Sequence, residues 1–274
     1  MTINFDLVIE TTEDSVDMKA GLESMQGVSD ALRCVAESVL TGKTPQRQTH
    51  KSKVRTSLKK SFKGSYGQVF SVDIYDDKLN KKLKTIGRPA FAELISYFIS
   101  ESLYIEARPL SARAKKTLDE LGEQSESVVN QLRVSALENI HQISLKFNHD
   151  IKIRYRKSRN DITTLANFNR NTAKSLEAKT SNETVDLNVI VTRLNIHTGN
   201  GRLQVEGQDE TVAFGFGITY RDVRLEAKKI FSENLNHNNG LKPSEWQYIK
   251  ISASPVRLKD GRVVKHIVKG FYEN

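Results

Sequence analysis

The chain has few of the residues that mark specialised protein classes. A single cysteine, Cys34, among 274 residues excludes an intramolecular disulfide framework and a zinc site built from several thiolates. Only five prolines, with 38% hydrophobic and 27% charged residues, describe an ordinary globular protein that can build a core. No apolar run approaches the roughly 20 residues that span a bilayer, and the first residues do not resemble a secretion signal. We therefore expect a cytoplasmic protein with no membrane partner, in which Cys34 is a buried structural thiol.

Positive charge is concentrated in one part of the chain. The net charge is +9, from 42 basic and 33 acidic residues. Residues 38–88 hold thirteen Lys or Arg against three acids, so this window is +10 and the other residues sum to −1. Binding a polyanion requires several cations within a short reach, which this clustering would supply, although a merely solvated face produces the same run.

Periodic patterns define the elements at the start of the chain. Residues 2–11 are apolar at every second position, which predicts a strand. From Asp17 to Leu40 apolar residues recur every three or four positions, which predicts a helix ending near Gly42. Residues 53–75 alternate again on both sides of KGSYG, so we expect a hairpin whose first strand has one apolar and one basic face.

Two helical regions follow. A helix with a broad apolar face is expected from Pro89, and a longer helical region spans about 111–147 with a break near Gly122. The apolar stripe of the longer region suits an internal core, a dimer face or a partner helix.

A second basic strand and a connection come next. In DIKIRYRKSR the residues Lys152, Arg154 and Arg156 alternate with apolar ones, which predicts a strand whose basic face joins the first. Residues 158–184 are rich in Asn, Ser and Thr with weak periodicity, which indicates a connection between domains. We place the boundary near residue 180, between a domain of residues 1–180 and one of residues 181–274.

The last 90 residues predict a small β-barrel. They contain five short alternating segments, separated by TGNG, GQDE, one helix-like piece at about 221–236 and KDG. Closure into a barrel would remove the edges that so short a sheet would expose. We therefore expect an α+β protein, with a mixed N-terminal domain of β-α-β-β-α order with long helices and a C-terminal five-stranded β-barrel.

Motifs for catalysis are incomplete. FKGSYGQVF has Phe62 where a kinase phosphate flap needs its first glycine, and no lysine follows on the next strand. TGKT at residues 41–44 follows a helix, whereas a phosphate-binding loop follows a strand. Two E-x-K triplets, at residues 177–179 and 226–228, match a nuclease spacing but lie in a linker and a helix. We expect no metal and no cofactor, and lean towards a protein without enzymatic activity.

Two aromatic residues of the barrel leave an alternative open. Phe214 and Phe216 lie two apart, as do aromatic residues that stack nucleic-acid bases, but such residues also fill the interior of small barrels. The second interpretation is favoured. His197, before the TGNG turn, is interpreted as a solvated loop residue.

Several segments together resemble an uncharacterised bacterial family. These are the opening strand, the helix ending in LTGKTP, the hairpin SFKGSYGQVFSVDI and the C-terminal VTRLNIHTGNGRL. The resemblance implies an N-terminal α/β domain followed by a five-stranded β-barrel, both of unknown function, and it assigns no catalytic residue.

These observations favour a non-enzymatic binding protein that engages DNA or RNA through basic residues. The candidate nucleic-acid-binding residues are Lys51, Lys53, Arg55, Lys59, Lys60 and Lys63, joined by Lys152, Arg154 and Arg156. The alternative is a protein-interaction component, an oligomer or an accessory subunit of a bacterial complex such as a defence system, that does not bind nucleic acid.

Overall fold

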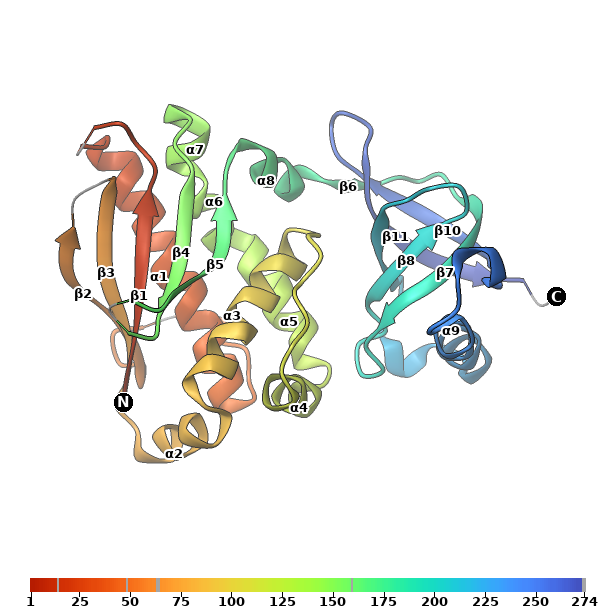
Figure 1. Ribbon diagram of the computed structural model, residues 1–274, viewed down its shortest axis with the longest axis horizontal. Helices are drawn as coiled ribbons and strands as arrows, with labels where there is room; N and C mark the ends of the chain where they lie inside the picture. The colour runs from red at the N-terminus through yellow and green to blue at the C-terminus, as the bar shows by residue number, and fades with distance from the viewer. Residues whose placement is uncertain (14, 48, 63–64, 159, 273–274) are drawn as a thin grey trace. The chain divides into compact units, whose positions relative to one another are not determined.

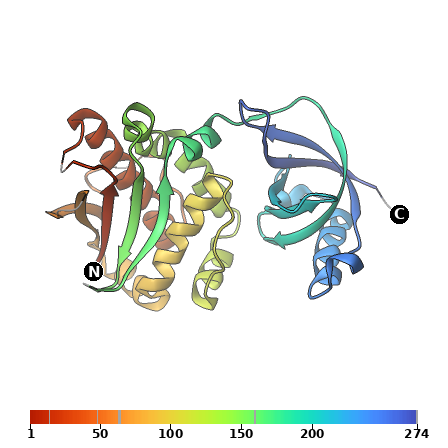
Figure 2. The ribbon, with the colours of Figure 1, turned by 45° about the horizontal axis from the view of Figure 1, so that its top comes forward.

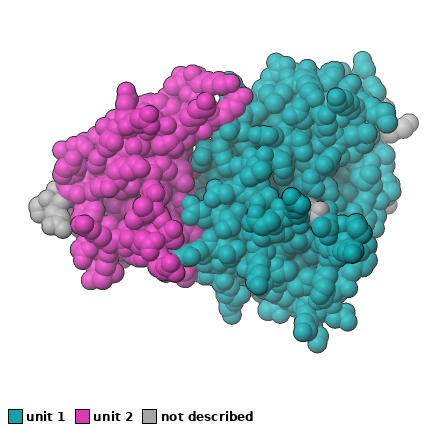
Figure 3. Space-filling view, turned by 180° about the vertical axis from the view of Figure 1, so that it is seen from behind, with its two compact units in different colours: residues 1–176 teal, residues 177–274 magenta. Residues whose placement is uncertain are grey.

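The computed structural model describes residues 1–13, 15–47, 49–62, 65–158 and 160–272. The chain forms two compact units, residues 1–176 and residues 177–274, which are coloured separately in Figure 3. The first unit combines an antiparallel sheet with helices and the second is a closed five-stranded β-barrel, so the expected α+β class is confirmed.

The first unit is built on a five-stranded antiparallel sheet in the order β2-β3-β1-β4-β5 (Figure 1). Its strands are β1 (Thr2–Ile9), β2 (Val54–Phe62), β3 (Tyr66–Ile74), β4 (Ile151–Arg156) and β5 (Ile162–Phe168). The first strand lies at the centre, where Phe5 pairs with Phe70 on one side and with Tyr155 on the other. Segments about 150 residues apart in the chain therefore become neighbours.

Helices fill the long connections of this unit. They are α1 (Met18–Thr41), α2 (Asp77–Ile86), α3 (Arg88–Ser102), α4 (Ala112–Leu121), α5 (Gln124–Gln131), a π-helical turn (Leu132–Ala136), α6 (Leu137–Ile140), α7 (Gln142–Phe147) and α8 (Arg170–Lys174). The first helix begins where the Asp17 side chain accepts a hydrogen bond from the Ala20 amide, and it ends at Gly42, whose left-handed conformation suits a residue without Cβ. No described helix is long and apolar enough to cross a membrane.

The helices pack on one face of the sheet (Figures 1 and 2). Side chains alternate along β1, so that Ile3, Phe5, Leu7 and Ile9 enter the core shared with the helices while Asn4 is exposed on the other side. We call this second side of the sheet the open face, because no described helix packs on it.

Helix α1 approaches its neighbours closely at Gly27. A Cβ atom added to Gly27 would lie 2.5 Å from the Ile140 amide nitrogen and 2.6 Å from the Ala136 carbonyl oxygen. These two atoms belong to α6 and to the end of the π-helical turn. The absence of a side chain at residue 27 is therefore what permits this contact between helices.

One prediction for the first unit needs correction, and one open alternative is decided. The segment after residue 158 is not simply a connection, because it forms β5 at the edge of the sheet and then α8. As an edge strand β5 buries only Leu165 and Phe168, which explains its polar composition. The apolar stripe of residues 111–147 is mostly internal, including Val128, Leu132 and Ile140, which agrees with the internal core among its three interpretations, while Val134 and Leu145 remain exposed.

Cys34 provides a first testable prediction. Its side chain is buried on α1, and burial together with the nearby Glu37 raises the pKa of the thiol to about 12. Because the thiolate is the reactive form, we expect native protein to resist a thiol reagent at about pH 8 and denatured protein to react with one equivalent. Spectrophotometric thiol titration of this single-cysteine chain would measure both states. Rapid labelling of native protein would contradict the buried position.

The second unit is a Greek-key barrel. Its strands are β7 (Val185–Leu194), β8 (Gly201–Val205), β9 (Thr211–Phe216), β10 (Ile249–Arg257) and β11 (Val263–Phe271), with α9 (Leu225–Asn238) before β10 and the short β6 (Lys179–Thr180) beside it. The first three form a meander, β10 returns beside β7, and β11 pairs with both β10 and β9. This closes a mixed ring of five strands.

Aromatic side chains fill the barrel. Phe214 is fully buried and its ring centroid lies 5.3 Å from that of Phe231 on α9. Phe216 lies 5.2 Å from the same ring.

His266 of β11 is also buried, and its Nδ1 atom has no hydrogen-bond partner in the described chain. Burial, helped by the charge of Arg257, lowers the pKa of His266 to about 4.

Candidate nucleic-acid interface

A bulge brings neighbouring lysines of β2 to the open face. Arg55 pairs with Asp73, whose side chain points away from the core. The register then shifts between Leu58 and Lys60, so that Lys59 is the extra residue of a β-bulge. Its Nζ atom lies 4.0 Å from the Asp73 carboxylate, which places Lys59 on the same face as Arg55.

The basic residues of β4 lie on this face too. Lys60 pairs with Val69, Val69 with Asp6, and Asp6 with Arg154, in one row across four strands. Directly paired residues of a sheet share a face. The structure therefore brings the cations of β2 and β4 onto one surface, with β3 and β1 between them (Figure 1).

Carboxylates orient the β4 side chains. Arg156 donates hydrogen bonds from Nε and Nη2 to the two oxygens of Asp6, each at 2.7 Å, and Arg154 Nη2 lies 3.1 Å from Oδ2. Asp6 is fully buried, whereas the arginine side chains remain 23% and 26% exposed. Lys152 forms an ion pair with Glu10. The buried carboxylate thus holds two guanidinium groups and neutralises one of them.

A second carboxylate on this face is held ionised. Asp73 accepts hydrogen bonds from the hydroxyls of Ser57 at 2.6 Å, Thr2 at 2.8 Å and Ser71 at 3.0 Å. Burial alone would raise the pKa of Asp73, but these hydroxyls and the charge of Lys59 hold it below its ordinary value. Acidic groups therefore interleave with the basic ones and reduce the positive charge of the face.

Lys51 and Lys53 precede β2. Lys53 donates to the carboxylate of Asp76 at 2.5 Å, at the start of α2, and the hydrogen bond lowers the pKa of Asp76. Lys51 is exposed in the loop before β2. Lys63 lies outside the described residues.

Two aromatic residues beside the cations were missed by sequence reasoning. Phe62 pairs with Gly67, and its ring occupies the space that a Gly67 side chain would fill. The guanidinium of Arg154 lies 5.6 Å from the centre of this ring, and that of Arg55 lies 5.1 Å from the ring of the exposed Tyr75. The period-two pattern of the hairpin places Tyr75 in phase with Asp73, a signal that could have identified it.

The strands β8 and β9 of the barrel present few groups for nucleic acid on their outer side. Phe214 is a core residue, whereas Phe216 packs against the same core and is only partly buried. Arg202 is buried, with Nε and Nη2 donating to Thr211 at 2.8 Å and 2.6 Å. The outward positions of β8 and β9, which are described throughout, carry no aromatic residue for stacking. This differs from barrels that bind oligonucleotides on these strands.

The described residues also contain no cluster of His, Cys, Asp or Glu suited to a metal ion. Glu177 forms a surface ion pair with Lys259 at 2.6 Å, and Glu226 lies on α9, so the two E-x-K triplets occupy separate places.

No protein-family model, no curated protein and no solved structure matches the chain.

Proposed function

We propose that the protein is a non-enzymatic binding protein that engages nucleic acid through the open face of its N-terminal sheet. The observation that carries the proposal is the set of cations that β2 and β4 contribute to one surface. They are Arg55, Lys59, Lys60, Lys152, Arg154 and Arg156. The resemblance to an uncharacterised bacterial family is part of this proposal and adds no residue to it.

The shape and chemistry of the face favour a single strand as ligand. Splayed bases can lie on an open antiparallel sheet, where aromatic side chains stack on them and cations contact the phosphates. Phe62 and Tyr75 supply the rings, each beside an arginine. Because Arg154 and Arg156 are tied to Asp6, we assign the phosphate contacts chiefly to Lys59 and Lys60, which are exposed.

A charge-reversal variant tests this assignment. We expect Lys59→Glu/Lys60→Glu to weaken binding of single-stranded DNA or RNA by about ten-fold or more at low salt, and to reduce the slope of log affinity against log salt by about two. Fluorescence anisotropy with labelled oligonucleotides across a salt series would measure both quantities.

The matched control is Lys115→Glu/Lys116→Glu on α4, which makes the same charge change at two exposed lysines off the sheet. Equal losses of affinity in both variants would show that binding depends on the net charge of the protein and not on the open face. Absence of binding by the unaltered protein, or binding indifferent to salt, would refute the proposal.

A protein-interaction role is the second candidate. A groove of about 270 Å³ lies between α1 and β2, with Leu22, Met25, Leu58 and Phe70 in its lining. Leu22 and Leu58 are 52% and 67% exposed and line the same groove, so they present a joined apolar patch to the solvent. This favours a homo-oligomer or accessory subunit that covers the groove.

Light scattering of the purified chain, with Leu22→Lys/Leu58→Lys as the variant, would test for a homo-oligomer. A dimer that the variant dissociates supports this candidate. For an accessory subunit, pull-down from bacterial lysate with and without nuclease separates the two functions, since loss of partners after nuclease treatment favours nucleic-acid binding.

A further inference from the structure

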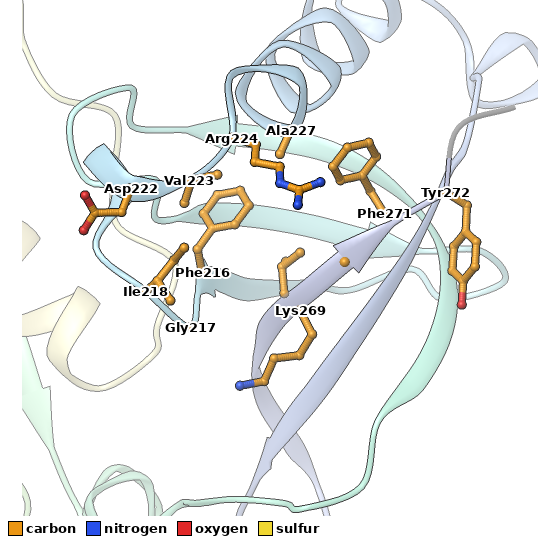
Figure 4. A pocket seen from close by; sticks show the side chains of 12 residues that line it. Phe216, Gly217, Ile218, Asp222, Val223, Arg224, Ala227, Lys269, Phe271 and Tyr272 are labelled. Atoms are coloured by element: carbon orange, nitrogen blue, oxygen red, sulfur yellow. The ribbon is translucent and has the colours of Figure 1, made fainter.

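A cavity of about 780 Å³ opens in the barrel unit where β9 ends (Figure 4). Its walls come from the end of β9, from the first turn of α9 and from the last residues of β11. All lining residues belong to the unit of residues 177–274, so none of them is a residue of the open face. Its volume falls within the range of small-molecule sites, about 300–1,000 Å³.

Aromatic and aliphatic side chains line part of this cavity. Phe216 is held by ring contacts with Phe231 and Tyr220, at centroid distances of 5.2 Å and 5.6 Å, and remains only partly buried. Phe271 of β11 and the buried Val268 lie in the same lining. A flat ring that enters the cavity would therefore contact an oriented aromatic surface.

Two cations without partners face the same space. Arg224 precedes α9, and Figure 4 shows its side chain directed between Phe216 and Phe271. Lys269 comes from β11. Neither side chain has a hydrogen bond or ion pair with any described residue. A guanidinium and an ammonium group that are free at the mouth of a cavity favour an anion, most strongly a phosphate.

The other groups around the cavity are compatible with an anion. The one carboxylate among the lining residues is that of Asp222. Its Oδ1 atom lies 3.8 Å from Nε of Arg221, and its side chain points away from Arg224 in Figure 4. The first turn of α9 has no side-chain cap, and its own carboxylate, Glu226, is not among the residues that line the cavity.

We propose that this cavity binds a phosphorylated nucleoside, with the base against Phe216 and Phe271 and the phosphate near Arg224 and Lys269. Such a ligand has a flat ring to contact the aromatic residues and a negative charge to contact the two cations, and one nucleotide fits within the volume of the cavity. Its source is either a free mononucleotide or the phosphorylated end of a nucleic-acid strand. The proposal does not depend on the open face of the first unit.

Calorimetric titration of the full chain with AMP, GMP, CMP and UMP, each alone, tests the proposal. At least one nucleotide should bind, and its affinity should fall about ten-fold or more in Arg224→Gln and several-fold in Lys269→Gln. Both residues are exposed, so these variants leave the core intact. The control Lys229→Gln removes an exposed charge of α9 outside the cavity and should bind as the unaltered chain does.

A second arm compares an oligonucleotide carrying a 5′-phosphate with the same strand carrying a 5′-hydroxyl. A preference for the phosphorylated strand that Arg224→Gln abolishes identifies strand ends as the source, and binding of mononucleotides alone identifies the free ligand. Lys59→Glu/Lys60→Glu should leave mononucleotide binding unchanged, which separates this site from the open face. No binding of any mononucleotide or phosphorylated end, or binding indifferent to Arg224→Gln and Lys269→Gln, would overturn the proposal.

Discussion

Replacing Gly27 by alanine is expected to lower the free energy of unfolding of the first unit by about 3 kcal/mol. The new methyl group would lie 2.5 Å from a backbone nitrogen of α6 and 2.6 Å from the carbonyl oxygen of Ala136. Backbone atoms cannot move aside as the end of a side chain can, so α1 must shift away from the π-helical turn. The loss exceeds the roughly 1 kcal/mol that alanine gains over glycine in helix propensity.

Gly21→Ala in the same helix is the matched control. Its methyl group would meet only the Val16 side chain, at 3.1 Å, so stability should change by about 1 kcal/mol or less. Urea unfolding followed by circular dichroism would compare the two variants with the unaltered chain. A Gly27→Ala protein as stable as Gly21→Ala would contradict the close approach of the helices.

The barrel unit should lose stability in mild acid because of His266. A histidine whose pKa is about 4 when folded and about 6.5 when unfolded binds more protons in the unfolded state between these values. The neutral form of His266 therefore costs the barrel no stability above about pH 6.5. Between pH 7 and pH 5 we expect the free energy of unfolding of the barrel to fall by about 2 kcal/mol. Trp246, the one tryptophan of the chain, lies in this unit, so its fluorescence would follow unfolding there.

His266→Leu should remove most of this pH dependence. Leucine also eliminates the buried Nδ1 atom that lacks a partner, so the variant should be at least as stable as the unaltered chain at pH 7. His237→Gln, at an exposed position of α9, should retain the full dependence. Parallel pH profiles for the unaltered chain and His266→Leu would show that other groups cause the acid sensitivity.

Much of the fold could be predicted because its periodic segments are also the buried ones. Helix α1 and the five barrel strands carry regular apolar patterns, and these elements are present. β5 could not be predicted in this way, because an edge strand needs few apolar residues. Its pairing with β4 depends on tertiary contacts that no local pattern records.

The candidate interface was predictable in composition and not in arrangement. Alternation in the hairpin predicts Arg55 and Lys59 on one face and Lys60 on the other. The register shift at the bulge places Lys60 opposite Val69 and so on the same face as Arg55 and Lys59. Asp6 binds arginines 148 and 150 residues away, and only the order of strands in the sheet brings them together. Arg224 and the phenylalanines of the barrel cavity likewise come from separate elements, so no motif joins them.

The bulge of β2 is also expected to protect the edge of the sheet against aggregation. β2 forms an edge of its sheet, where unpaired backbone groups can recruit strands from other molecules. The bulge makes this edge irregular, and its adjacent lysines add charge, so both features oppose pairing with another molecule. The exposed Leu58 beside the bulge would favour such pairing if the lysines were absent. Replacing Lys59 and Lys60 by neutral residues should therefore increase aggregation, whereas glutamates keep the edge charged.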